Sequence, residues 1–314
     1  MEPLKPARIR KGDVVGVLAP ASPIGDPARI EQGVRYLEGL GYRVQVGESV
    51  RKEHGYLAGT DEERLDDLHR MVKDRSVRMI IALRGGYGTP RLLARLRPRL
   101  FARDPKILVG FSDLTGLQLA LWESCRLVTF HGPMLGVDFA GVIDPYTEEM
   151  FWALVTSRRA FGELRMPDQA LPPVALRRGE ATGRLAGGNL SLVCSLMGTP
   201  FIPSFRKAVV FLEEVGEEPY RLDRMLTQLR LAGVFRRARA VVTGQFSDCV
   251  PRDPSRPSLS VDQILAETAG EAGLPFVAGM QFGHVTKKLT IPTGVKCRVD
   301  AAKASVRLLE GAVR

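Results

Sequence analysis

Short apolar segments alternate with helical segments over the first half of the chain, and this alternation restricts the possible folds most strongly. The expected strands are Val14–Ala19, Tyr42–Val46, Met79–Leu83, Ile107–Val109 and a short one that begins at Val128. Helices are expected between them, at Pro27–Leu40, from Thr60 to about Arg75, and at Tyr87–Leu100. The strands are apolar on both faces, as in sheets that helices cover on both sides. The pattern therefore predicts a parallel sheet with crossover helices.

The pattern changes beyond about residue 160. Residues 161–180 contain Pro167, Pro172 and Pro173 and show no sustained period, so we expect a linker there. Residues 181–314 have more expected strands and fewer helices than residues 1–160. We expect an α/β protein with an N-terminal parallel-sheet domain, 1–160, and a β-rich α+β or barrel-like C-terminal domain, 181–314.

Composition and charge narrow the function classes. Hydrophobic residues make up 45% of the 314 residues and charged residues 25%, which is typical of a globular protein with a real core. No apolar run reaches the roughly 18 residues that span a bilayer. The first residues lack the signature of a secretory signal, which favours the cytoplasm. The net charge of +10 comes from arginines spread along the chain, so we expect a solvated basic surface and no specific nucleic-acid or membrane partner.

Cysteines and histidines give no sign of a metal site. The four cysteines are isolated, with no Cys-x-x-Cys pair, and the four histidines lack the spacing of zinc proteases. This spacing argues against a zinc knuckle and against a zinc protease.

A serine stands at an expected strand-to-helix junction. The strand Ile107–Val109 is followed by Gly110, Ser112 and an apolar helical pattern from Leu114 onward. In a nucleophile elbow, a tight turn of this kind lifts the serine hydroxyl above the sheet, and the next helix directs its first amides at the same point. The second glycine of Gly-x-Ser-x-Gly is missing here. The alternative is that Ser112 only caps the helix.

A glycine cluster follows another expected strand, where Arg84-Gly85-Gly86-Tyr87 comes directly after Leu83. Ligands bind at the carboxyl ends of strands in α/β sheets, and glycines let backbone amides approach a ligand closely. An ordinary turn is the alternative interpretation.

A serine nucleophile needs a base and a carboxylate that orients the base. His284 follows a glycine shortly after an expected strand, and Glu213 ends another one. The order Ser112, Glu213, His284 is a known order for such triads. A lone histidine can equally be structural, and this applies also to His131, which ends the short strand from Val128.

Six motifs occur in order and together resemble one family. They are Arg84-Gly-Gly-Tyr-Gly, Gly110-Phe-Ser-Asp-Leu-Thr, His131-Gly-Pro, Gly187-Gly-Asn-Leu, Phe211-Leu-Glu-Glu-Val-Gly-Glu-Glu-Pro-Tyr-Arg-Leu-Asp-Arg, and Gly283-His-Val with Ile291-Pro-Thr-Gly. Over nearly the whole chain this resembles the LD-carboxypeptidase family of serine peptidases, which includes the microcin C immunity peptidases. The resemblance implies an active site in the cleft between an N-terminal α/β domain and a β-rich C-terminal domain.

The resemblance also implies roles for individual residues. Ser112 would be the nucleophile, His284 the general base and acid, and Glu213 the orienting carboxylate. Members usually carry Glu-Asp where this chain has Glu213-Glu214, so Glu214 stays open as the alternative. The amides of Gly86 and Asp113 would form the oxyanion hole.

Substrate contacts are expected at the glycine cluster. A substrate carboxylate needs a cation or amides, because burying it unpaired is costly. We expect these contacts from Arg84, Gly85 and Tyr87, although Arg84 could equally form a structural salt bridge.

The implied reaction removes the terminal D-alanine from cytoplasmic murein tetrapeptides, and the resemblance implies that it needs no metal and no other cofactor. The resemblance also implies a homodimer, as in many members. The partner is thus a peptide with a C-terminal D-amino acid. One alternative is an immunity-type amidase that cleaves aminoacyl or peptidyl nucleotides, whose members present an aromatic side chain from a loop. Trp122 and Trp152 lie on expected helices, so no such loop is expected. A two-domain protein that binds a ligand without chemistry is the other alternative.

Overall fold

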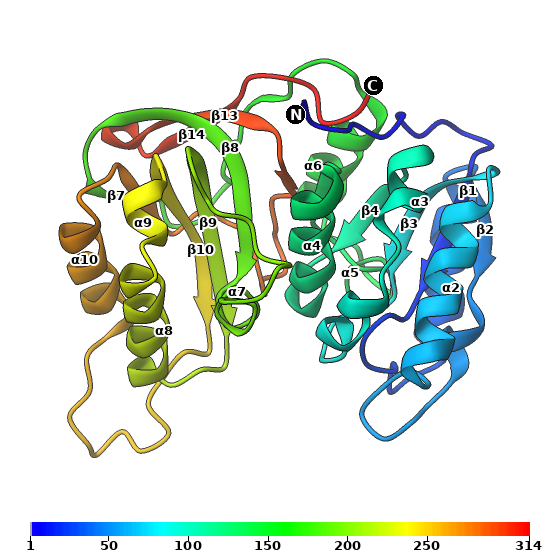
Figure 1. Cartoon of the computed structure of the whole chain (residues 1–314), viewed down its shortest axis with the longest axis horizontal. Coiled ribbons are helices and arrows are strands. Elements are labelled where there is room, and N and C mark those ends of the chain that lie inside the picture. Colours follow the sequence, from blue (N-terminus) through cyan, green and yellow to red (C-terminus); the bar gives the residue numbers. More distant parts are fainter. Residues whose placement is uncertain (1) are drawn as a thin grey trace.

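The computed structural model describes residues 2–314 and contains two sheets that lie side by side (Figure 1). The first sheet has six strands in the order β12-β5-β4-β3-β1-β2. Its parallel strands are β1 (Val14–Leu18), β2 (Arg43–Val46), β3 (Val77–Ala82), β4 (Ile107–Gly110) and β5 (Thr129–His131). These are the apolar segments expected as strands, and they form the parallel sheet that was predicted.

The sixth strand of this sheet comes from the other end of the chain. Strand β12 (Ile291–Thr293) pairs antiparallel with β5, with Ile291 opposite His131. A segment from beyond residue 290 thus completes the sheet of the first half.

The second sheet has eight strands in the order β6-β14-β13-β8-β9-β10-β11-β7. They are β6 (Gly162–Glu163), β7 (Val174–Arg177), β8 (Glu180–Asn189), β9 (Ala208–Val215), β10 (Ala240–Ser247), β11 (Phe276–Ala278), β13 (Lys296–Asp300) and β14 (Ser305–Leu308). The four central strands β8, β9, β10 and β11 are parallel, and the outer pairings are antiparallel. The second half is therefore β-rich, as expected, and it is an open mixed sheet instead of a barrel.

The segment 161–180, which we expected to be a linker, contributes two strands to this sheet. β6 pairs with β14 and β7 pairs with β11, so both lie at sheet edges. Each is at most four residues long, too short for a period to show in the sequence.

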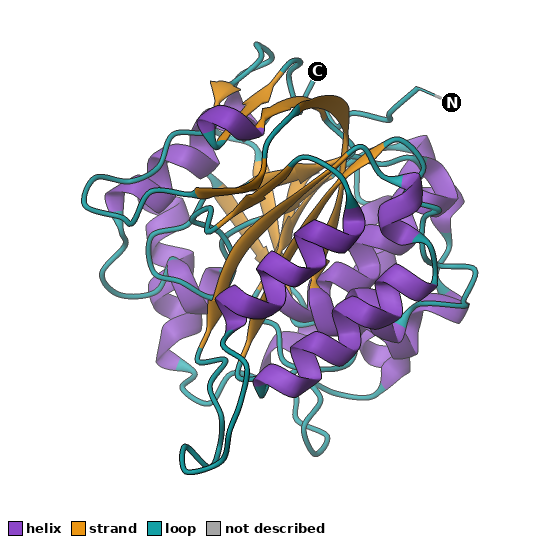
Figure 2. Ribbon diagram, turned by 90° about the vertical axis from the view of Figure 1, so that its left-hand side faces the viewer, coloured by secondary structure: helices purple, strands orange, loops and turns teal. Residues whose placement is uncertain are grey.

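Helices flank the strands, which run through the middle of the molecule (Figure 2). In the first half they are α1 (Ala28–Gly39), α2 (Asp61–Lys73), α3 (Pro98–Arg103), α4 (Thr115–Cys125), α5 (Leu135–Asp138) and α6 (Pro145–Thr156). In the second half they are α7 (Leu190–Ser195), α8 (Pro219–Leu231), α9 (Val234–Arg237) and α10 (Val261–Ala272). Short 3₁₀ turns are η1 (Glu48–Arg51), η2 (Thr89–Arg95), η3 (Ser112–Leu114) and η4 (Ala301–Lys303).

The single helix expected at Tyr87–Leu100 is absent. A 3₁₀ turn, η2, is followed by the short helix α3, which begins at Pro98. A residue that precedes proline is disfavoured in the helical region, and Arg97 has an extended ψ of 80°. The helix therefore stops and restarts at this proline.

The two halves meet where the carboxyl ends of their central strands face each other. The Thr115 hydroxyl, at the start of α4, accepts a hydrogen bond of 3.0 Å from the Asn189 amide at the end of β8. A Cβ at Gly188 would lie 2.5 Å from that hydroxyl, so glycine permits this close approach. The end of β9 and the turn after β4 are thereby brought to the same place.

Candidate active site

Ser112 lies at the turn between β4 and α4 and has a strained backbone. Its φ angle is +62°, a left-handed conformation that is uncommon for a residue with a side chain. A Cβ at Gly85 would be 2.8 Å from the Ser112 Cβ, so the glycine cluster packs directly against this turn. Strain of this kind is typical of a nucleophile elbow. Ser112 begins the 3₁₀ turn η3, and the N-cap position of α4 is held by Leu114.

Asp113 holds the turn in place. Its carboxylate accepts a 2.7 Å hydrogen bond from the Thr89 amide, and the Thr89 hydroxyl donates to the Asp113 carbonyl. The side chain is fully buried, and burial raises its pKa to about 6. This carboxylate is therefore part of the scaffold of the turn.

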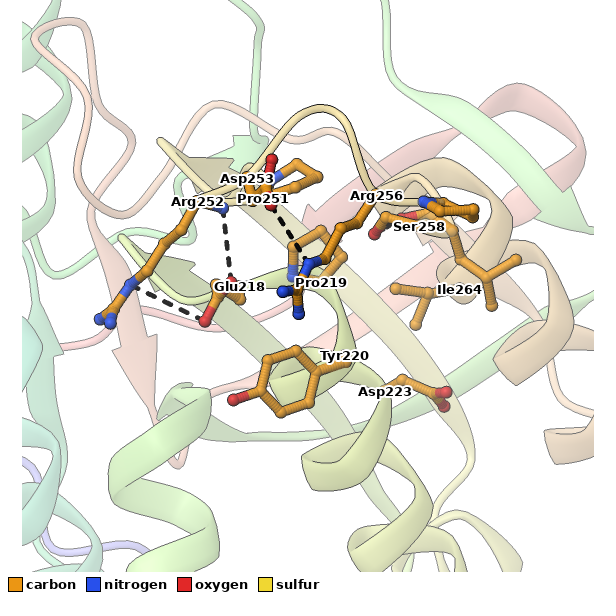
Figure 3. A pocket seen from close by; sticks show the side chains of 12 residues that line it. Glu218, Pro219, Tyr220, Asp223, Pro251, Arg252, Asp253, Arg256, Ser258 and Ile264 are labelled. Atoms are coloured by element: carbon orange, nitrogen blue, oxygen red, sulfur yellow. Dashed lines mark hydrogen bonds and ion pairs between the residues drawn. The ribbon is translucent and has the colours of Figure 1, made fainter.

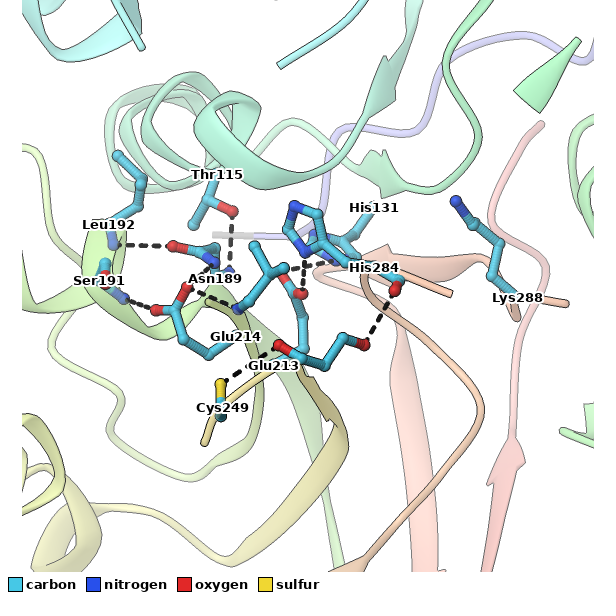
Figure 4. A network of polar contacts seen from close by, with 12 residues as sticks. Thr115, His131, Asn189, Ser191, Leu192, Glu213, Glu214, Cys249, His284 and Lys288 are labelled. Atoms are coloured by element: carbon cyan, nitrogen blue, oxygen red, sulfur yellow. Dashed lines mark hydrogen bonds and ion pairs between the residues drawn. The ribbon is translucent and has the colours of Figure 1, made fainter. Parts of the chain in front are cut away.

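Glu213 and His284 form the central polar pair of the site (Figure 4). The Glu213 Oε2 atom lies 2.7 Å from His284 Nδ1, in a hydrogen bond between the end of β9 and the loop after β11. Glu213 is completely buried, whereas the His284 side chain is 20% exposed. A carboxylate on Nδ1 fixes the tautomer in which Nε2 is free to accept a proton.

The neighbouring Glu214 has a different task. Its oxygens accept hydrogen bonds from the Asn189 side-chain amide at 2.8 Å and from the Ser191 backbone amide at 2.7 Å. Burial raises its pKa. Glu214 faces the start of α7, and within residues 2–314 its hydrogen bonds go to Asn189, Ser191 and Val215 and to no histidine. The geometry thus distinguishes the two glutamates that the sequence left open.

His284 reaches the serine turn through Phe111. The Phe111 ring, one residue before Ser112, packs edge-on against the His284 ring with centroids 4.9 Å apart. The Lys288 ammonium lies 4.2 Å from the centroid of the Phe111 ring and 2.5 Å from an Asp138 oxygen. Phe111, His284, Lys288 and Asp138 border a hollow of about 360 Å³. A small ligand can reach the imidazole through this opening.

The remaining predicted residues lie along the glycine cluster. Gly86 has a φ of +107°, and a Cβ there would be 2.3 Å from the Ser22 hydroxyl. That hydroxyl accepts a hydrogen bond of 3.1 Å from the Tyr87 amide. The Arg84 guanidinium donates to the Pro23 carbonyl at 3.2 Å and has no carboxylate partner within residues 2–314. Tyr87 is exposed and packs near Tyr56.

Two side chains near the site were not expected from the sequence. Lys288 had no sequence signal at all, since it is one of two adjacent lysines in a loop. Phe111 was part of the quoted serine motif but had no assigned role. Both are brought to the site by contacts between segments distant in the chain.

A second hollow, of about 520 Å³, lies between the start of α8 and the loop 250–259 (Figure 3). Two ion pairs lie at this hollow, with Arg252 at 3.7 Å from Glu218 and Arg256 at 3.2 Å from Asp253. It contains neither the serine nor the glutamate–histidine pair, so it does not compete as the catalytic site.

Residues 2–314 contain no cluster of three or more His, Cys, Asp or Glu side chains that could hold a metal ion. No helix among them is both long enough and apolar enough to cross a membrane.

An elbow-like serine followed along the chain by a glutamate and a histidine is an arrangement typical of serine hydrolases. Known proteins refine this class. The description "LD-carboxypeptidase N-terminal domain" matches residues 15–132, and "LD-carboxypeptidase C-terminal domain" matches residues 182–299. The chain belongs to the LD-carboxypeptidase family of peptidases, which confirms the resemblance seen in its motifs.

Individual relatives cover almost the whole chain. The probable murein peptide carboxypeptidase of Bacillus subtilis is 39% identical over 308 residues, which are 98% of this chain and 95% of that protein. The microcin C7 self-immunity protein MccF of Escherichia coli is 25% identical over 336 residues, with 98% and 96% covered. The crystal structure of muramoyltetrapeptide carboxypeptidase from Oxalobacter formigenes has a TM-score of 0.82 at 29% identity, with 94% and 97% covered.

Proposed function

We propose that this protein is a serine LD-carboxypeptidase that releases the terminal D-alanine from murein tetrapeptides by hydrolysing the bond between an L-centre and a D-residue. The observation that carries this proposal is the 2.7 Å hydrogen bond between Glu213 and His284, with His284 packed on the residue that precedes the strained Ser112. The murein peptide carboxypeptidases among its relatives support the substrate class. The proposal includes a cytoplasmic setting and a homodimer, both expected from the family.

In the proposed reaction, the Ser112 hydroxyl attacks the scissile carbonyl carbon while His284 Nε2 takes its proton. Glu213 orients the imidazole and stabilises its cation. In this proposal the amides of Gly86 and Asp113 donate hydrogen bonds to the negatively charged carbonyl oxygen. His284 then gives the proton to the amine of the departing D-alanine, and water hydrolyses the acyl-serine by the same route in reverse.

The C-terminal carboxylate of the substrate needs a cationic partner. Arg84 has no carboxylate partner within residues 2–314 and borders the glycine cluster, so it suits this role together with Gly85 and Tyr87. This arrangement would select peptides whose free carboxylate lies one residue beyond the scissile bond.

The test is mass spectrometry of a tetrapeptide digest. With the wild-type protein, the mass of the peptide is expected to fall by about 71 Da, the mass of one alanyl residue. The variants Ser112→Ala and His284→Ala are expected to lower turnover by about 10³-fold or more. Ser258→Ala, an exposed serine in the loop 250–259, is the matched control and should retain full turnover. Undiminished turnover by Ser112→Ala, or none by the wild type, would favour a protein that binds a ligand without chemistry.

A second candidate function is cleavage of aminoacyl or peptidyl nucleotides, favoured by the 25% identity to MccF over nearly the whole chain. The positions of the tryptophans argue against it. Trp122 is buried on α4, and Trp152 lies on α6, stacked on Tyr42 with centroids 5.0 Å apart. Neither is presented from a loop. Parallel digests of the tetrapeptide and an aminoacyl sulfamoyl-adenosine discriminate the two functions. Cleavage of the nucleotide analogue alone would make nucleotide cleavage the preferred function.

A further inference from the structure

His131 is a buried titratable group that the proposed reaction does not use. It is the last residue of β5 and is 1% exposed. The rings of Phe111, Phe211 and Phe282 surround it edge-on, with centroids between 5.5 and 6.4 Å away. An imidazole sealed among aromatic rings can satisfy its polar atoms only through a few specific neighbours.

Three buried polar atoms at this place have no hydrogen-bond partner within the described chain. They are both ring nitrogens of His131 and the Glu213 Oε1 atom. His131 Nε2 faces Glu213 Oε1 at 3.7 Å, while the other oxygen of the same carboxylate is bonded to His284. A fully buried carboxylate with one unsatisfied oxygen is costly, and the imidazole is the donor that faces it.

We propose that His131 is a positioning residue, a neutral imidazole that donates its Nε2–H to Glu213 Oε1 and holds the carboxylate between two histidines. A shift of less than about 1 Å brings the two atoms within hydrogen-bond distance. His131 keeps its proton throughout, so no group is transferred. The consequence for turnover rests on the proposed function, but the hydrogen bond itself does not.

The charged groups around His131 support the neutral form. Glu213 on β9, His284 after β11 and Lys288 before β12 all face it, and the Lys288 charge is shared with Asp138. Burial, reinforced by the positive charges of His284 and Lys288, lowers the pKa of His131 to about 4 despite the nearby Glu213. At neutral pH the ring therefore carries one N–H, which it can direct at the carboxylate.

The position of His131 in the fold lets this contact link the two sheets. His131 lies opposite Gly110 in the parallel pairing of β5 with β4, so it shares a sheet with the turn that carries Ser112. Glu213 belongs to the other sheet. A hydrogen bond between them would set the distance between the two halves at the reacting atoms, and with it the placement of His284 over the serine.

Two substitutions separate a donor from a space-filling role. His131→Gln retains an N–H that can point toward Glu213, whereas His131→Leu fills a similar volume without a donor. For His131→Leu we expect kcat on the tetrapeptide to fall about 10- to 100-fold with little change in KM. We expect His131→Gln to stay within about fivefold of the wild type, with both variants cooperatively folded.

The pH profile tests the electrostatic part. Without the donor the Glu213 carboxylate becomes more basic and holds the proton of the Glu213–His284 pair more tightly. The acidic limb of kcat/KM should therefore move up by about 0.5 to 1 pH unit in His131→Leu and stay in place in His131→Gln. Equal losses in both variants, or an unmoved limb in His131→Leu, would show a packing role and overturn the proposal.

A measurement without turnover separates this proposal from the proposed function. In ¹⁵N-histidine-labelled Ser112→Ala protein, the ring nitrogen shifts should show His131 neutral with the proton on Nε2, and this signal should shift in Ser112→Ala/Glu213→Gln. A proton on Nδ1 would contradict the hydrogen bond. Full turnover by Ser112→Ala would defeat the proposed function alone and leave this result standing.

Discussion

At the scale of single residues, two adjacent glutamates on one strand have opposite tasks. Side chains alternate across a strand, so neighbours face different surroundings. Glu213 faces the two histidines, and Glu214 faces Asn189 and the start of α7. Chemical identity is the same for both, and only the face of β9 distinguishes them.

This difference predicts different outcomes for the same substitution. Glu213→Gln should lower kcat about 10³- to 10⁴-fold with little loss of stability, because an amide cannot stabilise the imidazolium. Glu214→Gln should lower kcat less than tenfold but destabilise the fold by about 1–3 kcal/mol, because its new N–H₂ group faces other donors. Tetrapeptide kinetics and urea unfolding check both variants. A larger loss of kcat in Glu214→Gln than in Glu213→Gln would show that Glu214, and not Glu213, orients the imidazole.

At the scale of elements, the turns that follow the strands hold the groups that we propose to react. Gly283, directly before His284, has a φ of +102°, and a Cβ there would lie 2.6 Å from Glu213 Oε2. The loop after β11 can therefore approach the carboxylate only because this residue has no side chain. Gly198, in the connection after α7, also has a positive φ of +83° but faces open space.

These two glycines form a matched pair. Gly283→Ala and Gly198→Ala should each cost about 1–2 kcal/mol of stability from the backbone conformation alone. Gly283→Ala should in addition lower kcat about 100-fold or more, because the new methyl group displaces Glu213 from His284. Thermal unfolding and tetrapeptide turnover measure the two effects. Equal kcat values for the two variants would show that the approach of this loop is not needed for turnover.

At the scale of the whole molecule, the two halves share structure. Strand β12 completes the first sheet from a segment after residue 290, and the apolar cores contain buried residues of both halves, such as Leu117 with Leu226 and Val109 with Phe211. Near the termini, the Arg314 amide donates to the Pro6 carbonyl at 2.8 Å. The division at residue 160 remains our proposal for where the nucleophile-bearing domain ends.

This sharing predicts how a fragment behaves. Residues 1–160 expressed alone should fail to form a cooperatively folded domain, because β5 loses its β12 neighbour and α4 loses its contact with β8. The full chain should unfold in a single transition. Circular dichroism during heating checks both. A soluble fragment with its own sharp transition would show that the first half folds without the second.

Local patterns in the sequence were sufficient for much of this protein. The apolar strands of the first sheet, the serine turn and the glycine cluster each depend on neighbouring residues, so periodicity and turn chemistry predict them. The ordered motifs identified the family, which its matching domains confirm. These features can be predicted from the sequence because the interactions that form them join residues that are close together in the chain.

Only the tertiary structure decided the rest. The hydrogen bond between Glu213 and His284, the approach of His131 to that carboxylate, the Lys288–Asp138 pair and the place of β12 each join segments that are from about 70 to more than 150 residues apart. Such contacts depend on sheet order and on which face of a strand points inward, and neither leaves a periodic trace in the chain. The sequence thus determined which chemical groups are present, and the fold decided which of them meet.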